Sequence, residues 1–80
     1  MSNVEKYVNA FVEGLEIDEA LAKEGLEYQS IPEWDSVGHM GLISALEDTF
    51  DIEMDTDDII DLSSFEKGME ILTKNYQIDF

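Results

Sequence analysis

Apolar residues recur at helical spacing in the first part of the chain. Ser2 and Glu5 have the spacing of a capping box, and the apolar positions after them return every three or four residues. This pattern predicts a helix over residues 3–15. The stripe that it turns toward a core consists of Val4, Tyr7, Val8, Phe11 and Leu15.

The segment 16–35 has no such periodicity. It contains Gly25, Pro32 and scattered acids, with a few apolar anchors between them. Composition of this kind is typical of a surface loop, and we expect a short helical turn within it at about residues 18–23.

A second helix is predicted immediately after this loop. Pro32 disfavours helix at the residue before it, and either Asp35 or Ser36 is a good N-cap, so the helix should run from there to about Phe50. At 100° per residue, one arc of this helix forms the expected core stripe. That arc holds His39, Leu42, Ile43, Leu46 and Phe50, while the opposite side holds Val37, Gly41, Ser44 and Asp48.

Two further helices are predicted in the last third of the chain. Asp55 or Thr56 can cap a short third helix, and Ser63 and Glu66 have the spacing of a second capping box that opens a fourth. The apolar residues of the third are Ile59, Ile60 and Leu62, and those of the fourth are Phe65, Met69, Leu72 and Tyr76. We expect the acid-flanked tail beyond them to fray.

These elements predict an all-α fold. No segment alternates in the manner of a strand, and the chain shows no internal repeat. We expect one domain over residues 1–80, a small four-helix bundle with three main helices and a short third one. With 80 residues the core must be modest, and the chain has no cysteine with which to form a disulfide.

Charge narrows the range of partners. The chain has 20 acidic residues, 4 lysines and no arginine, and between Glu24 and Glu66 it has 13 acids and no base. Repulsion disfavours nucleic acid and anionic membrane surfaces, so partners should be basic proteins. The same repulsion should weaken the fold at low salt. With no signal peptide or long apolar run in the sequence, we expect a cytoplasmic monomer that does not insert into membranes.

Ser36 is the residue of greatest chemical interest. As a hydrolase nucleophile it would need a base and an orienting acid, but the only histidine, His39, lies three residues further along the same helix. We therefore expect no enzyme. A hydroxyl at the exposed start of a helix instead suits a phosphodiester, because free backbone N–H groups and the positive end of the helix dipole stabilise phosphate there.

The stretch DSVGHMGLISALEDTFDIEM, residues 35–54, resembles the attachment helix of acyl carrier proteins, and Trp34 resembles residues that often precede that motif. The likeness extends in family order over nearly the whole chain. It implies that Ser36, preceded by Asp35, receives a 4'-phosphopantetheine arm from coenzyme A through a separate magnesium-dependent phosphopantetheinyl transferase. It also implies that the thiol of this arm carries acyl intermediates as thioesters and presents them to partner enzymes.

The resemblance implies further partners and a docking surface. Acyl-loading and acyl-processing enzymes with basic surfaces should meet the exposed Val37 and the acids nearby. Those acids are Glu47, Asp48, Asp57, Asp58 and Asp61. Carriers of the fatty-acid type usually have acids where this chain has Gly38, Gly41 and Ser44, so we expect a specialised pathway of the fatty-acid or polyketide type. The two glycines indicate a mobile helix start or the close approach of a partner.

Other interpretations remain open at this stage. Residues 51–62 begin like a calcium-binding EF-hand loop, but Thr56 stands at the required glycine and Leu62 at the required glutamate, which leaves only weak divalent binding. An unmodified acidic adaptor would use the same surface, and an aminoacyl or peptidyl carrier would have a similar serine motif. We expect His39 to be half-buried packing bonded to a loop carbonyl, with contact to the arm as the alternative.

Overall fold

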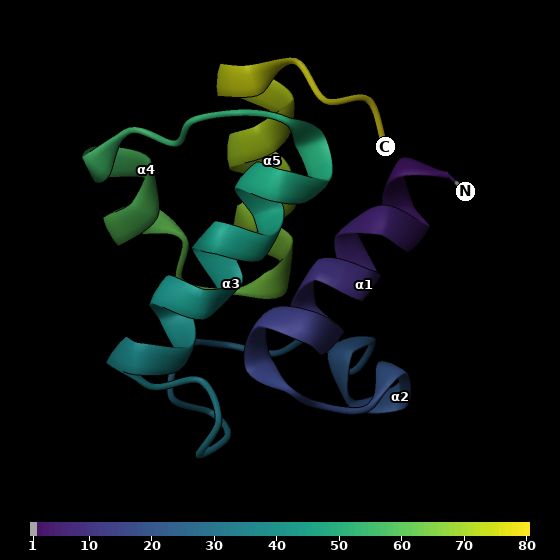
Figure 1. Cartoon of the computed structure of the whole chain (residues 1–80), viewed down its shortest axis with the longest axis vertical. Helices are drawn as coiled ribbons and strands as arrows, with labels where there is room; N and C mark the ends of the chain where they lie inside the picture. The colour runs from purple at the N-terminus through teal and green to yellow at the C-terminus, as the bar shows by residue number, and fades with distance from the viewer. Residues whose placement is uncertain (1) are drawn as a thin grey trace.

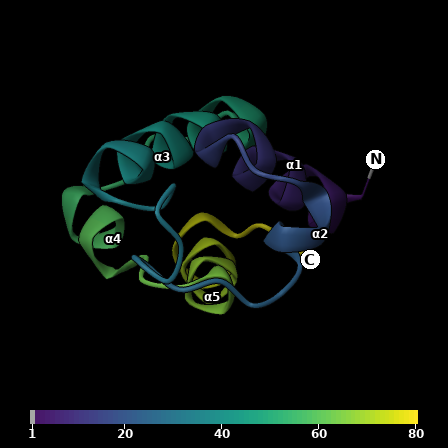
Figure 2. The same ribbon diagram turned by 90° about the horizontal axis from the view of Figure 1, so that it is seen from below.

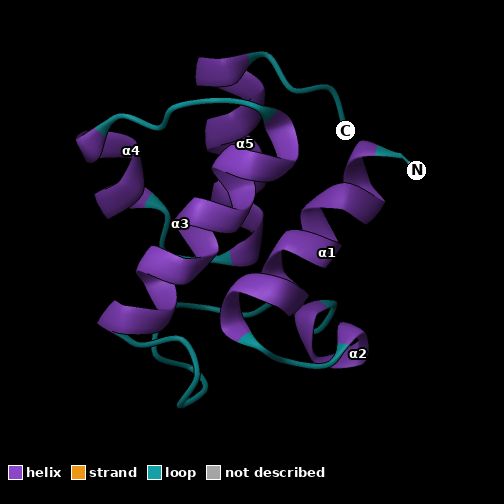
Figure 3. Cartoon of the chain, viewed as in Figure 1, coloured by secondary structure: helices purple, strands orange, loops and turns teal. Residues whose placement is uncertain are grey.

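The computed structural model describes residues 2–80, and within them the chain is helical without a strand. The helices are α1 (Asn3–Leu15), α2 (Glu19–Ala22), α3 (Ser36–Phe50), α4 (Thr56–Asp61) and α5 (Phe65–Tyr76). The expected all-α class is confirmed, and the helical turn expected at 18–23 is the four-residue α2. Figure 3 shows loops connecting the helices over the described part of the chain.

The helices enclose one core. In Figures 1 and 2, α1 and α3 lie side by side in one layer, α5 lies across from them, and α4 closes the edge between α3 and α5. The largest side chains with almost no exposed surface come from every part of the chain: Tyr7, Phe11, Trp34, Leu42, Leu46, Leu62 and Leu72. The apolar periodicity of α1, α3 and α5 therefore does face a shared interior.

Aromatic side chains fill the side of the core next to α1. Tyr7 packs edge-on against Phe65 at 4.8 Å between ring centroids, and Phe11 packs edge-on against Trp34 at 5.4 Å. The buried Tyr7 hydroxyl donates to the Phe65 carbonyl at 2.6 Å, so the polar end of this side chain is satisfied. Burial raises the pKa of Tyr7.

α1 begins with the expected capping box. The Ser2 hydroxyl accepts from the Glu5 amide at 3.2 Å, and the Glu5 carboxylate accepts from the Ser2 amide at 3.3 Å. The Ser2 amide and the Ser2 hydroxyl, which donates to the same carboxylate at 3.1 Å, together lower the pKa of Glu5. The reciprocal bonds satisfy backbone donors that have no partner within the helix.

α1 and α3 approach each other backbone to backbone. A Cβ added at Gly14 would lie 2.6 Å from the Leu42 Cα, and one added at Gly41 would lie 2.8 Å from the Gly14 oxygen. The expectation that Gly41 points away from the core is therefore wrong, since it faces α1. At Gly38, a Cβ would collide with the Glu33 carbonyl. The close approach inferred from the glycines is thus made within the chain itself.

The long loop is fixed by two backbone hydrogen bonds to the α4–α5 connection. The Tyr28 amide donates to the Ser63 carbonyl and the Phe65 amide to the Leu26 carbonyl, each at 2.8 Å. This pair has the geometry of an isolated antiparallel bridge. Segments about 37 residues apart in sequence are thereby joined beside the start of α3.

The predicted start of the fourth helix, now α5, is wrong by one residue. The N-cap of α5 is Ser64, whose hydroxyl accepts from the Lys67 amide at 2.9 Å, so the predicted Ser63–Glu66 capping box does not form. The Ser63 carbonyl instead accepts from the Tyr28 amide of the long loop, so the helix starts one residue later.

The tail after α5, which was expected to fray, lies against the core. Phe80 packs edge-on against Tyr7 at 5.3 Å, and Ile78 is half-buried against the core. The Asn3 side-chain amide donates to the Asp79 carbonyl at 2.8 Å, so the tail lies along the start of α1 (Figure 1).

No helix among residues 2–80 combines the length and apolar character that crossing a bilayer requires.

Replacing Gly14 by alanine should destabilise the fold by about 1–3 kcal/mol, because its new methyl group meets backbone atoms of α3 that cannot move aside. Alanine otherwise favours a helix over glycine by roughly 1 kcal/mol. Urea denaturation of Gly14→Ala measures the loss, and Ser44→Ala, on the exposed side of α3, is the matched control. Equal or greater stability of Gly14→Ala would contradict the close approach.

Salt should stabilise this fold, because its formal net charge is −16. Between about 0.01 M and about 1 M salt, the Debye length falls from about 30 Å to about 3 Å, which screens repulsion among the acids. Thermal unfolding by circular dichroism should show a Tm that rises with ionic strength, equally in NaCl and KCl. An unchanged Tm would show that self-repulsion does not limit stability.

Candidate functional site

Ser36 is the first residue of α3 and is exposed. Of the two candidate N-caps, the structure selects Asp35, whose carboxylate accepts from the Gly38 amide at 2.8 Å and whose carbonyl accepts from the His39 amide. The amides of Ser36 and Val37 belong to the first turn, where no intrahelical carbonyl precedes them. Ser36 thus presents its hydroxyl beside backbone donors at the positive end of a helix of 15 residues.

An apolar groove opens beside Ser36, between the first turns of α3 and the helix α4. Its volume is about 450 Å³. We call it the α3–α4 groove, and its walls are Tyr28, Ser36, His39, Met40, Ile59, Ile60, Leu62 and Ser63. The groove contains no carboxylate among its lining residues, although the chain around it is strongly acidic.

Two residues that line this groove, Met40 and Ile60, have exposed apolar side chains, and Val37 is exposed on the neighbouring side of α3 that faces α1. Val37 is 79% exposed, Ile60 71% and Met40 59%. Folding alone does not require large apolar residues at such exposed positions.

His39 connects three segments of the site. The Trp34 indole N–H donates to His39 Nδ1 at 2.9 Å, and His39 Nε2 lies 2.7 Å from the Ile59 carbonyl. Because an indole can only donate and a carbonyl can only accept, this geometry selects the neutral tautomer with its proton on Nε2. We call the chain of two bonds the His39 bridge. Both ring nitrogens are engaged, so neither serves Ser36 as a base.

The far side of α4 is held to α5. The Asp58 carboxylate accepts from the Asn75 side-chain amide at 2.8 Å and from the Tyr76 hydroxyl at 2.7 Å. The Tyr76 oxygen in turn accepts from the Asp55 amide at 2.7 Å. Partial desolvation first, and then the neighbouring Asp58 carboxylate, raise the pKa of Tyr76.

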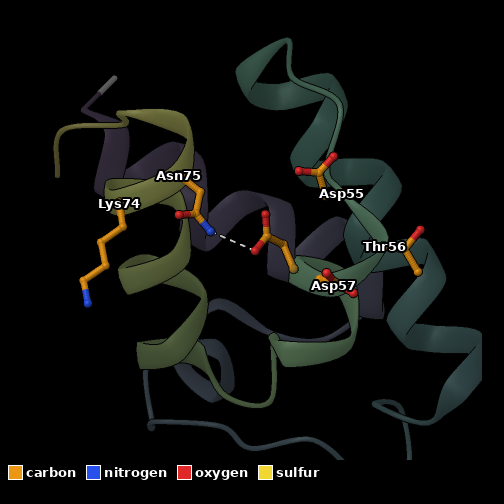
Figure 4. Close-up of a pocket in the computed structure, with 6 residues that line it drawn as sticks. Asp55, Thr56, Asp57, Lys74 and Asn75 are labelled. Atoms are coloured by element: carbon orange, nitrogen blue, oxygen red, sulfur yellow. Dashed lines mark hydrogen bonds between the residues drawn. The ribbon is translucent and has the colours of Figure 1, made fainter.

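A wider depression lies between the start of α4 and the end of α5. Its volume is about 720 Å³, and Figure 4 shows its polar lining, with Asn75 bonded to Asp58 and Lys74 directed away from the acids. Lys74 pairs instead with Glu70 on its own helix at 3.1 Å. Within residues 2–80, no three histidine, aspartate or glutamate side chains are arranged to hold a metal ion.

The structure separates the predicted docking residues into two groups. Val37, Asp48, Asp57 and Asp61 are exposed. Glu47 and Asp58 have internal partners, since the Glu47 carboxylate accepts from the Met54 amide at 2.9 Å and Asp58 holds α5. The Glu47 bond closes the turn after α3, and the Asp58 bonds join α4 to α5. Because each reaches outside its own helix, helical periodicity gave no sign of them.

Several residues of the site were not singled out from the sequence for this role. Tyr28 and Ser63 reach the α3–α4 groove because the loop bridge brings them together, and the fully buried Trp34 forms part of the core next to it. The one local sign of the groove in the sequence is Ile60, an apolar residue next to Asp61 in a short helix that is otherwise rich in acids.

Asp35 should contribute to stability as a cap. Asp35→Ala should lower the free energy of unfolding by about 1 kcal/mol, because the Gly38 amide loses its acceptor. Asp35→Asn should keep most of that stability, since an amide oxygen accepts the same bond. Urea denaturation measures both variants, and an equal loss in the two would assign the contribution to charge rather than to the cap.

Comparison with known proteins identifies no family for this chain. No family model, no curated protein and no solved structure matches the chain. Its function is therefore inferred from the position of Ser36 and from the groove beside it.

Proposed function

We propose that this chain is a carrier protein that holds acyl intermediates as thioesters on a 4'-phosphopantetheine arm attached to Ser36. The observation that carries the proposal is the position of Ser36, exposed at the first residue of α3 and on the wall of an apolar groove. The likeness of residues 35–54 to the attachment helix of acyl carrier proteins supports the same assignment, and the bundle of helices is compatible with it.

The chain contributes a nucleophilic hydroxyl and a phosphate-compatible setting. The Ser36 Oγ would form an ester bond to the phosphorus next to pantetheine while the pyrophosphate bond of coenzyme A breaks. Adenosine 3',5'-bisphosphate leaves, and the hydroxyl proton passes to a base of the transferase. The first-turn amides of α3 and its dipole then stabilise the phosphodiester. When bound, the arm supplies a thiol that carries the cargo.

The lining of the α3–α4 groove favours an uncharged acyl cargo over an aminoacyl one. An ammonium group would find no carboxylate among the groove residues, and desolvating it there would be costly. The aliphatic side chains of Met40, Ile59 and Leu62 offer apolar contact instead.

Charge supports partners with basic docking surfaces. The lysine-free stretch from Glu24 to Glu66 contains both walls of the groove and the exposed Asp48, Asp57 and Asp61. Opposite charge on a partner would steer encounter and orient it toward Ser36, while the exposed apolar side chains of Val37, Met40 and Ile60 would make close contact.

The test is covalent modification of the purified chain. Incubated with coenzyme A, magnesium and a broad-specificity phosphopantetheinyl transferase, it should gain the mass of one 4'-phosphopantetheine by intact-mass spectrometry. Ser36→Ala should gain nothing, because the hydroxyl is absent.

Ser63→Ala is the matched control, since Ser63 is also exposed and lines the same groove. It should be modified like the wild type. An unmodified wild-type chain, with a known carrier modified in the same tube, would refute the proposal and leave an acidic adaptor as the function.

A further inference from the structure

The two walls of the α3–α4 groove are joined at two points, by the backbone bond from Tyr28 to Ser63 and by the side chain of His39, which reaches α4. Tyr28, Ser36, His39 and Met40 form one wall, and Ile59, Ile60, Leu62 and Ser63 form the other. The bond from His39 Nε2 to the Ile59 carbonyl, at 2.7 Å, runs from the first wall to the second. The Tyr28–Ser63 bond lies outside α4, so the distance between α4 and the first turns of α3 depends on the His39 bond.

The helix that forms the second wall is weakly anchored by packing. α4 has six residues and none of them is buried, so apolar contact holds it less firmly than it holds α1, α3 or α5. Its polar attachments are the Asp58 bonds to α5 on the far side and the His39 bond on the groove side. Ile59 lies in the last turn of α4, where carbonyls have no intrahelical partner, so His39 also caps this helix.

Trp34 determines which ring nitrogen of His39 carries the proton. Its fully buried indole N–H donates to Nδ1, so Nδ1 must be the acceptor. The proton of the ring is therefore on Nε2, which donates across the groove. The Trp34 and His39 rings stack at 6.2 Å between centroids with an interplanar angle of 14°, and Tyr28 packs edge-on against His39 at 5.5 Å. The donor that closes the groove is thus held in place by the core.

We infer that His39 determines how large an apolar group the α3–α4 groove admits, by holding α4 against α3 through its Nε2 proton. His39 is a positioning residue in this role and takes no part in bond formation. The identity of the admitted group as thioester cargo rests on the proposed function, but the closure of the groove by His39 does not.

Two substitutions each remove a different one of the two hydrogen bonds in the His39 bridge. Asn places an acceptor oxygen where His has Nδ1, so His39→Asn keeps the bond from Trp34 and loses the bond to Ile59. Gln places an N–H donor near the position of Nε2, so His39→Gln keeps the bond to Ile59 and loses the one from Trp34. Comparing them separates the wall-to-wall bond from the general contribution of His39 to packing.

The experiment measures the affinity of the neutral apolar dye N-phenyl-1-naphthylamine for the unmodified chain by fluorescence. His39→Asn should bind it about fivefold more tightly than the wild type, the factor that corresponds to a net hydrogen-bond contribution of about 1 kcal/mol to closure. His39→Gln should bind it as the wild type does.

Tyr76→Phe is the control for general loosening of α4. It removes both hydrogen bonds of the Tyr76 hydroxyl, the one to Asp58 and the one from the Asp55 amide, and leaves Asn75 bonded to Asp58. Dye affinity should stay at the wild-type value. An equal increase in Tyr76→Phe and His39→Asn, or no increase in His39→Asn, would overturn the inference.

A measurement on the wild type keeps the test independent of how well the variants fold. Nitrogen-15 NMR of the His39 ring at neutral pH should find the proton on Nε2, and a proton on Nδ1 would overturn the inference. Should the dye results hold while Ser36 is never modified, the role of His39 in closing the groove stands and only the nature of its occupant changes.

Discussion

The close approach of α1 and α3 sets the position of every other part of the structure. Gly14 and Gly41 let the two backbones nearly touch, so one side of α3 is fully used by α1. The remaining sides of α3 must then serve the core, through Leu42 and Leu46, and the site, through Ser36 and His39. A bulkier residue at the crossing would push α3 outward and change the distance from its first turn to α4.

Two kinds of contact hold the two halves of this molecule. Around α1, apolar and aromatic packing dominates, with the rings of Tyr7, Phe11 and Trp34 at its centre. Around α4, the attachments are hydrogen bonds to His39, Asn75 and Tyr76. Hydrogen bonds are directional and can be exchanged with water, whereas apolar burial is not directional, so the region beside Ser36 can rearrange at lower cost than the region beside α1.

The sequence predicted what depends on local spacing. The limits of α1 and α3 follow from capping residues and apolar periodicity, and the exposure of Val37 follows from its angle on the helix. Long-range backbone bonds could not be predicted in this way. The Tyr28–Ser63 bond moved the start of α5 by one residue, and the contact of Phe80 with Tyr7 holds against the core a tail that local composition predicted to fray. The orientation of Gly41 was likewise predicted wrongly, because the backbone that it admits, at Gly14, lies 27 residues away.

The burial of Trp34 has a practical consequence. It is the only tryptophan of the chain, it has no exposed surface, and its indole nitrogen is bonded to His39. Its ultraviolet emission therefore originates at the junction of the loop, α3 and the groove, with no contribution from another indole. Any event that rearranges this junction, whether a protein docking onto it or a small molecule entering beside it, carries an intrinsic optical reporter that requires no label.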